Sequence, residues 1–185
     1  MGNIPKDFYS DLDNQPLKAC KVCEKQITEG KDPYIIEKAY KRTEEGEDLT
    51  LFELAMCMNC AQNQANKISE ESRAFIQNTM MSESIMQKRA QLFSSDWESN
   101  WKKKCLHSSN EIKVNEEYHI VGHFLGEDIL PGQPPFVMGQ TLIDYLQEHI
   151  STETKEEWDD FGKTYLGPTD PHLKALLEDY QYTLV

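Results

Sequence analysis

The sequence feature that most constrains this chain is a pair of Cys-x-x-Cys motifs, one at residues 20–23 and one at residues 57–60. Two intervening residues let the backbone turn back, so that both sulfurs of a motif can reach one metal ion. The two motifs together supply four thiolates, which is the number that a closed tetrahedral zinc site needs. The chain has only five cysteines, so this spacing predicts one structural Zn²⁺ per chain. The predicted ligands are Cys20, Cys23, Cys57 and Cys60. The alternatives are two dithiol or disulfide pairs, or an iron–sulfur cluster, although the usual ferredoxin spacings are absent.

The segments around the motifs predict secondary structure of three kinds. Residues 16–25, which carry the first motif, are typical of a short polar turn of the knuckle type. Residues 33–40 and 49–56 are rich in β-branched, aromatic and other apolar residues and predict two strands, joined by a Gly-containing turn at residues 44–48. The second motif leads directly into residues 61–68, whose composition favours a helix.

This order of knuckle, β-hairpin and a last cysteine pair at a helix N-terminus resembles the treble-clef, zinc-ribbon-like group of four-cysteine zinc folds, over roughly residues 16 to 80. Thiolates at a helix start also make physical sense, because the positive end of the helix dipole favours anionic sulfur. The resemblance is to an architecture and not to one family. Treble clefs carry out many functions, so the resemblance implies a scaffold and not a task.

The second half of the chain follows the same order as the first, with matching features 80 to 85 residues apart. A cysteine, a strand, a Gly-Glu-Asp turn, a second strand and an Ile-Ser pair recur in sequence, at residues 105, 118–121, 126–128, 136–138 and 150–151. Three of the four cysteine positions become Ser108, Gly139 and Leu142. We therefore interpret the second half as a degenerate copy that has replaced its metal with apolar residues.

The predicted fold class is α+β, with two tandem treble-clef-like halves of which only the first binds zinc. Residues 1–93 form a zinc-binding domain with a long helical segment over residues 60–93, broken near Ser69 or Ser82. Residues 94–185 form the degenerate copy and acidic C-terminal helices, one beginning at Thr152 and one at Asp170-Pro171.

A second metal site is the competing interpretation of the second half. Its ligands would be Cys105, His107, His119 and His123. Residues 118–124 predict a strand, however, and two residues four apart on a strand are separated by roughly 13 Å. A shared metal ion needs their side chains much closer together, so satisfied structural histidines are the default interpretation.

Charge and motif content restrict the function classes. The formal net charge of -13, from 32 acidic and 19 basic residues, disfavours nucleic acid and anionic membrane surfaces as partners. No apolar run is long enough to span a bilayer. The N-terminal residues lack the apolar region of a signal peptide, and four of the five cysteines fall in metal-type pairs, so we expect a reducing, cytoplasmic location.

Catalysis finds little support, because phosphate-binding, dinucleotide-binding, nucleophile-elbow and zinc-protease motifs are all absent. Four cysteines would also close the zinc sphere to water. The leading hypothesis is a non-catalytic, zinc-stabilised protein-interaction or regulatory module. The acidic C-terminal part is a solvated face or a docking surface for a basic protein partner. The alternatives are a thiol-based switch in which cysteine oxidation releases zinc, and a nucleic-acid or ribosome-associated protein.

Overall fold

Two long strands, β1 (Pro33–Arg42) and β2 (Asp48–Cys57), form the hairpin that the sequence predicts between the cysteine motifs. Gly46 lies in the connecting turn with a φ of 83°, a conformation that favours glycine.

The computed structural model describes residues 4–94, 101–167 and 180–184. The other described elements are η1 (Lys6–Phe8), α1 (Met58–Ala65), α2 (Glu70–Met80), α3 (Glu83–Ser94), η2 (Trp101–Lys103), β3 (Glu117–Leu125), β4 (Asp128–Ile129), β5 (Phe136–Gly139), α5 (Gln140–His149) and α6 (Thr152–Tyr165).

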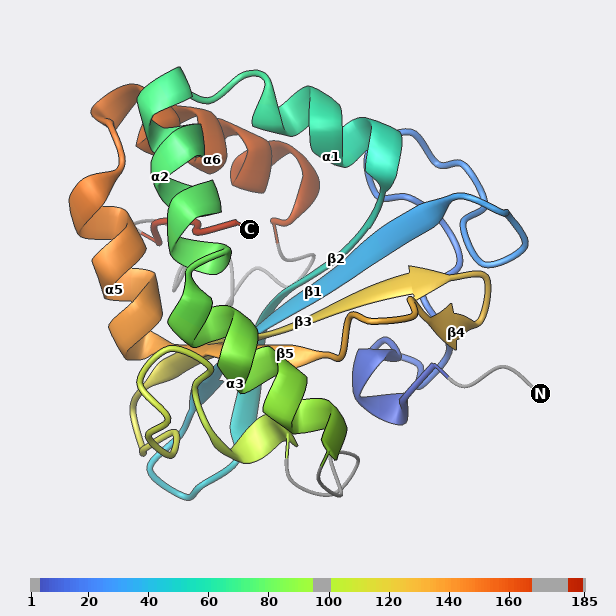
Figure 1. Cartoon of the computed structure of the whole chain (residues 1–185). Coiled ribbons are helices and arrows are strands. Elements are labelled where there is room, and N and C mark those ends of the chain that lie inside the picture. The colour runs from blue at the N-terminus through green and yellow to red at the C-terminus, as the bar shows by residue number, and fades with distance from the viewer. Residues whose placement is uncertain (1–3, 95–100, 168–179, 185) are drawn as a thin grey trace.

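The strands form one antiparallel sheet at the centre of a mixed α+β fold (Figure 1). Strand β1 lies between β2 and β3, and both β4 and β5 pair with β3. Strands from both predicted halves therefore join in the same sheet. The register of the β1–β3 pair places Glu37 opposite Val121.

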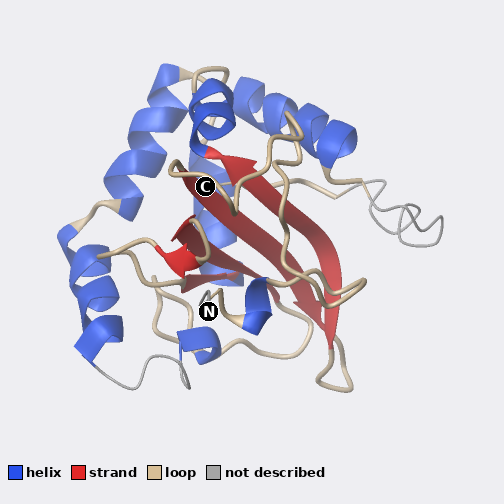
Figure 2. Cartoon of the chain, turned by 90° about the vertical axis from the view of Figure 1, so that its right-hand side faces the viewer, coloured by secondary structure: helices blue, strands red, loops and turns tan. Residues whose placement is uncertain are grey.

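The two faces of the sheet are covered differently. The helices gather along one side, whereas loops and the two short 3-10 helices lie along the other (Figure 2). On the loop side the Phe8 ring stacks on Trp101 with 5.5 Å between ring centroids, and it meets Phe124 of β3 edge-on. These aromatic contacts hold the N-terminal segment against the sheet, because large buried rings contribute much of a core's stabilisation.

The helical segment predicted after the second motif is confirmed, and it is broken at both predicted serines. Helices α1, α2 and α3 are separated at residues 66–69 and 81–82. The hydroxyl of Ser69 accepts a hydrogen bond from the Ser72 backbone N–H, which is the N-cap interaction that starts α2. The helix predicted from Thr152 is confirmed as α6, whereas the one predicted from Asp170 lies outside the described residues.

Two short turns, residues 19–26 and residues 104–111, are built in the same way. In each turn the first and last residues form an antiparallel bridge, and the backbone N–H of the cysteine donates to a carbonyl five residues later. The residue four positions after the cysteine, Glu24 or Ser109, has a positive φ of 59° or 62°. The predicted knuckle of the first half thus has a counterpart of matching backbone geometry in the second half.

The starts of α2 and α6 are joined by a reciprocal set of hydroxyl contacts. Ser69 caps α2 and Ser151 caps α6, each through its own hydroxyl. The Ser69 backbone N–H donates to Thr154 Oγ1 at 3.2 Å, and the Ser151 backbone N–H donates to Ser72 Oγ at 2.8 Å. Each helix start therefore satisfies a backbone donor of the other, so the two ends are fixed side by side.

Candidate metal centre

The four cysteines of the two motifs come together at one end of the hairpin. Cys20 and Cys23 lie on the turn at residues 19–26. Cys57 is the last residue of β2 and the N-cap of α1, and Cys60 lies in the first turn of that helix. Their sulfur atoms all lie within 4.8 Å of one another. The structure therefore confirms that the predicted residues form a group that can hold a metal ion.

Backbone hydrogen bonds bring the two motifs together. The Lys21 N–H donates to the Ala55 carbonyl at 2.8 Å, which fastens the turn to β2 two residues before Cys57. Because β2 leads directly into α1, the second motif lies at the N-terminal end of a helix dipole. That end favours anionic sulfur.

Burial and mutual contact shift the pKa values of these thiols. At Cys20, burial is the largest influence and raises the pKa, but backbone N–H groups of Cys57, Cys23 and Val22 outweigh it and lower the pKa to about 7. Burial raises the pKa of Cys57, and burial together with the neighbouring thiols raises the pKa of Cys60. Four anionic sulfurs at such separations repel one another, and the positive charge of a bound cation offsets this repulsion, so that all four thiols can lose their protons.

The spacing of the sulfurs fits a tetrahedral ion. Sulfurs about 2.3 Å from a zinc ion, in tetrahedral arrangement, lie roughly 3.8 Å apart. The Sγ atoms of Cys23 and Cys57 are 3.8 Å apart. Cys20, Cys57 and Cys60 are buried, while Cys23 is exposed. The donor set is chemically suited to Zn²⁺, which when bound would supply a fourfold cross-link between the turn, β2 and α1.

The second predicted ligand set is not brought together. Its four members are Cys105, His107, His119 and His123. Within the described part of the chain, the four motif cysteines form the metal-competent group, and these residues do not form another. The Cys105 sulfur accepts the Gly139 N–H at 3.2 Å, and both ring nitrogens of His119 contact carboxylates. His119 and His123 lie four apart on β3, where strand spacing keeps them from sharing an ion.

Apolar packing fills the second half where the cysteines lie in the first. Gly139 is the N-cap of α5, as Cys57 is of α1, and Leu142 is the third residue of α5 and completely buried. A Cβ atom at Gly139 would lie 2.9 Å from Ile112 Cδ1 and 3.0 Å from Cys105 Cβ. A cysteine side chain at position 139 would therefore be too close to these two neighbours.

A buried charged cluster, which the sequence did not reveal, lies on the helix side of the sheet. His119 is fully buried, with Nδ1 2.7 Å from Glu37 and Nε2 2.9 Å from Glu117. The Tyr180 hydroxyl also donates to Glu117. Burial, the largest influence, lowers the pKa of His119, but Glu117 and Glu37 together outweigh it and raise the pKa to about 9. The ring is therefore an imidazolium at neutral pH.

This cluster predicts a pH-dependent stability. The pKa of His119 is raised to about 9 in the folded chain from about 6.5 in the unfolded chain. The contribution of the protonated ring to the free energy of unfolding is therefore complete below pH 6.5, and it decreases as the pH rises toward 9. The loss amounts to roughly 3 kcal/mol. Urea unfolding at a series of pH values measures it. A free energy of unfolding that rises over this interval would contradict the charge assignment.

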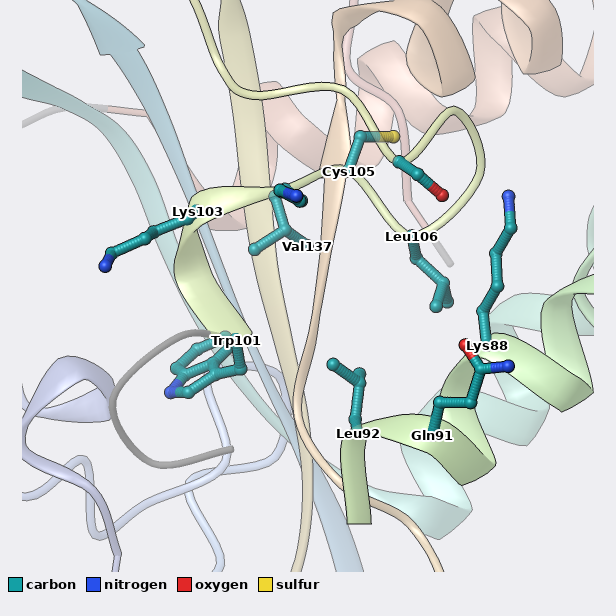
Figure 3. A pocket seen from close by; sticks show the side chains of 10 residues that line it. Lys88, Gln91, Leu92, Trp101, Lys103, Cys105, Leu106 and Val137 are labelled. Atoms are coloured by element: carbon teal, nitrogen blue, oxygen red, sulfur yellow. The ribbon is translucent and has the colours of Figure 1, made fainter. Parts of the chain in front are cut away.

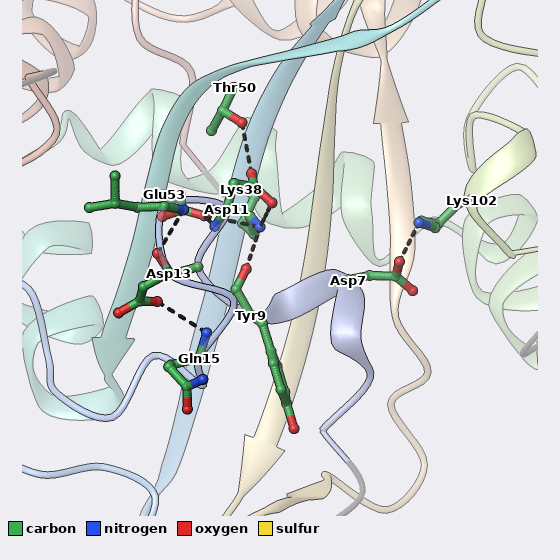
Figure 4. A network of polar contacts seen from close by, with 11 residues as sticks. Asp7, Tyr9, Asp11, Asp13, Gln15, Lys38, Thr50, Glu53 and Lys102 are labelled. Carbon is green, nitrogen blue, oxygen red and sulfur yellow. Dashed lines mark hydrogen bonds and ion pairs between the residues drawn. The ribbon is translucent and has the colours of Figure 1, made fainter. Parts of the chain in front are cut away.

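A second buried charge anchors the N-terminal loop on the opposite face of the sheet (Figure 4). Lys38 is completely buried, and its Nζ lies 2.7 Å from Asp11 and 3.0 Å from Glu53. Thr50 donates to the other oxygen of Asp11 at 2.7 Å. The sequence did contain one signal for these buried charges, the adjacent residues Glu37 and Lys38 in the middle of an apolar strand. Adjacent strand residues point to opposite faces of a sheet, and a charged residue that is buried on either face requires a partner.

The structure also contains a cavity of about 430 Å³ between α3, η2 and the turn at residues 104–111 (Figure 3). Its lining combines the lysines Lys88, Lys103 and Lys104 with apolar side chains such as Trp101 and Leu106. Among the described residues, no histidine or carboxylate lines it.

Comparisons with protein-family models, with curated proteins and with solved structures found no match to this chain. Among the helices of residues 4–94 and 101–167, none combines the length and the apolar character that crossing a bilayer requires.

Proposed function

We propose that this chain is a non-catalytic protein-interaction module whose fold is stabilised by one structural Zn²⁺. The observation that carries the proposal is the convergence of four cysteine sulfurs within 4.8 Å of one another. Four thiolates complete a tetrahedral zinc sphere and leave no position for a substrate or a hydrolytic water. The Cys-x-x-Cys spacing of both pairs favours zinc over the ferredoxin type of iron–sulfur cluster.

We further infer that residues 1–93 and 94–185 are tandem treble-clef-like units, of which the second is metal-free. The matching turns at residues 19–26 and 104–111 support this, as do the strand-to-helix transitions into α1 and α5. A two-fold relation between the copies would produce two further features of the structure. These are the reciprocal contacts between the starts of α2 and α6, and the antiparallel pairing of β1 with β3.

The proposed partner is a protein with a basic surface. The chain carries a net charge of -13, and α6 presents the exposed acidic side chains Glu153, Glu156 and Asp160. Complementary charge speeds association and sets specificity. Each charged side chain at the edge of an interface also makes binding more dependent on salt concentration.

The test begins with partners captured from the native source, and it measures their affinity for two charge-neutralised variants. Replacing Glu153, Glu156 and Asp160 by their amides should weaken binding at least tenfold at low salt. The matched control replaces the exposed Glu44, Glu45 and Glu47 of the hairpin turn by glutamine, which removes the same charge elsewhere. Equal affinity for both triple variants would contradict the assignment of α6.

The alternative of a thiol-based switch is favoured by one observation, the exposure of Cys23 beside Cys57. In this scheme peroxide oxidises the two thiolates to a disulfide, is itself reduced to water, and zinc is released. Zinc release by mild peroxide, reversed by a thiol reductant and zinc, would support the switch. Zinc that stays bound under the same treatment would support a purely structural site.

A further inference from the structure

A second cavity, of about 300 Å³, lies where α1 and α2 pass over the ends of β1 and β2 near the cysteines. Its walls include Ile35 and Met56 from the strands, Ala61 from α1, Ile76 from α2 and Trp158 from α6. The volume is at the lower end of the roughly 300–1,000 Å³ that small-molecule sites occupy. Walls of this composition suit a small ligand with an apolar body.

Small side chains on α1 leave this space open. Ala61 and Ala65 both line the cavity, and they lie one helical turn apart on the same face. Helix α5 begins after a strand as α1 does, and its fourth residue, which corresponds to Ala61, is the buried Ile143. The same position is thus filled in one helix and left open in the other.

Among the residues that the structure describes, one cation lines the cavity, and no carboxylate pairs with it. Arg73 of α2 makes only long contacts, from Nη1 to the Ala65 carbonyl at 3.5 Å and to Asn66 Oδ1 at 3.4 Å. Among the described residues, no carboxylate lies within ion-pair distance of its guanidinium. The chain has 32 acidic residues, yet the N–H groups of this planar guanidinium remain available to bind the carboxylate of a ligand.

We propose that this cavity binds a medium-chain monocarboxylic acid, with its apolar chain between α1 and α2 and its carboxylate on Arg73. The proposal does not depend on the protein partner discussed above. The apolar walls exclude water from the chain, and the guanidinium gives the carboxylate a charge-assisted hydrogen bond at the rim. Ligand and metal are also linked, because α1 forms one wall of the cavity and begins at the cysteine site.

The test is calorimetric titration of the full, zinc-loaded chain with hexanoate, octanoate and decanoate. Affinity should rise about fourfold per methylene until the cavity is filled. A terminally brominated decanoate should quench the fluorescence of Trp158, which lines the cavity, whereas decanoate without bromine should not. No heat and no quenching at millimolar ligand would overturn the proposal.

Two variants and a control separate the contributions of cavity and charge. Ala61→Ile should fold normally, because α5 carries isoleucine at this position, and it should lower decanoate affinity at least tenfold by filling the space. Arg73→Gln should lower decanoate affinity about tenfold and leave decanol affinity unchanged. Lys41→Gln removes an exposed charge outside the cavity, and it should change neither the decanoate affinity nor the decanol affinity. Unchanged decanoate affinity in the first two variants would assign binding to another place and overturn the proposal.

Discussion

Replacing either Cys20 or Cys60 by serine should abolish zinc binding and unfold the N-terminal half of the chain. Structural zinc contributes an apparent binding free energy of about 10–16 kcal/mol in small zinc folds, which is comparable to the whole stability of a domain. A hairpin with one short helix cannot bury enough apolar surface to replace it. Because β1 also pairs with β3, the loss should extend to the central sheet. Metal analysis together with amide dispersion in NMR spectra measures both effects.

The matched control is Cys105→Ser, which changes the fifth cysteine of the chain. The Cys105 sulfur is buried and accepts the Gly139 N–H, and a serine hydroxyl can accept the same bond. This variant should keep its zinc and lose at most about 1–2 kcal/mol. A Cys20 and Cys60 double-serine chain with unchanged thermal stability would rule out the structural role of the site.

Replacing His119 by leucine should destabilise the chain by about 3–5 kcal/mol at pH 7, because it leaves the buried Glu37 and the partly buried Glu117 without their counter-charge. Glu37 is almost completely buried and lies 2.7 Å from His119 Nδ1. The same change at His149, which is exposed but stacks on Phe75 and Tyr145, serves as the control and should have an effect within about 1 kcal/mol. Chemical denaturation of both variants gives the comparison, and a loss below 1 kcal/mol at His119 would show that the cluster is not an ion pair.

The sequence predicted the parts of the fold that depend on local signals. The strands of the hairpin follow from β-branched and aromatic runs. The helix breaks follow from Ser69, which caps α2, and from the Ser82-Glu83 pair, at which α3 begins. The cysteine site was predictable because each motif carries two ligands at a fixed spacing. A single strand-to-helix transition at Cys57 then brings the motifs together.

Contacts between distant segments were not predictable. Glu37 and His119 are 82 residues apart, so neither residue gives a local signal of the other. The pairing of β1 with β3 depends on which sheet edge remains open after the hairpin has formed, and sequence periodicity does not specify that choice. The cavity beside Arg73 was also missed, because an unfilled volume depends on how α1 and α2 cross and not on either helix alone.

The measurement that tests the central claim most directly is the metal content of the purified chain by native mass spectrometry, combined with counting of reactive thiols. We expect one zinc per chain, with the four motif cysteines protected from alkylation until zinc is removed. A chain that carries no zinc when zinc is supplied, or whose motif cysteines alkylate freely in its presence, would contradict the account.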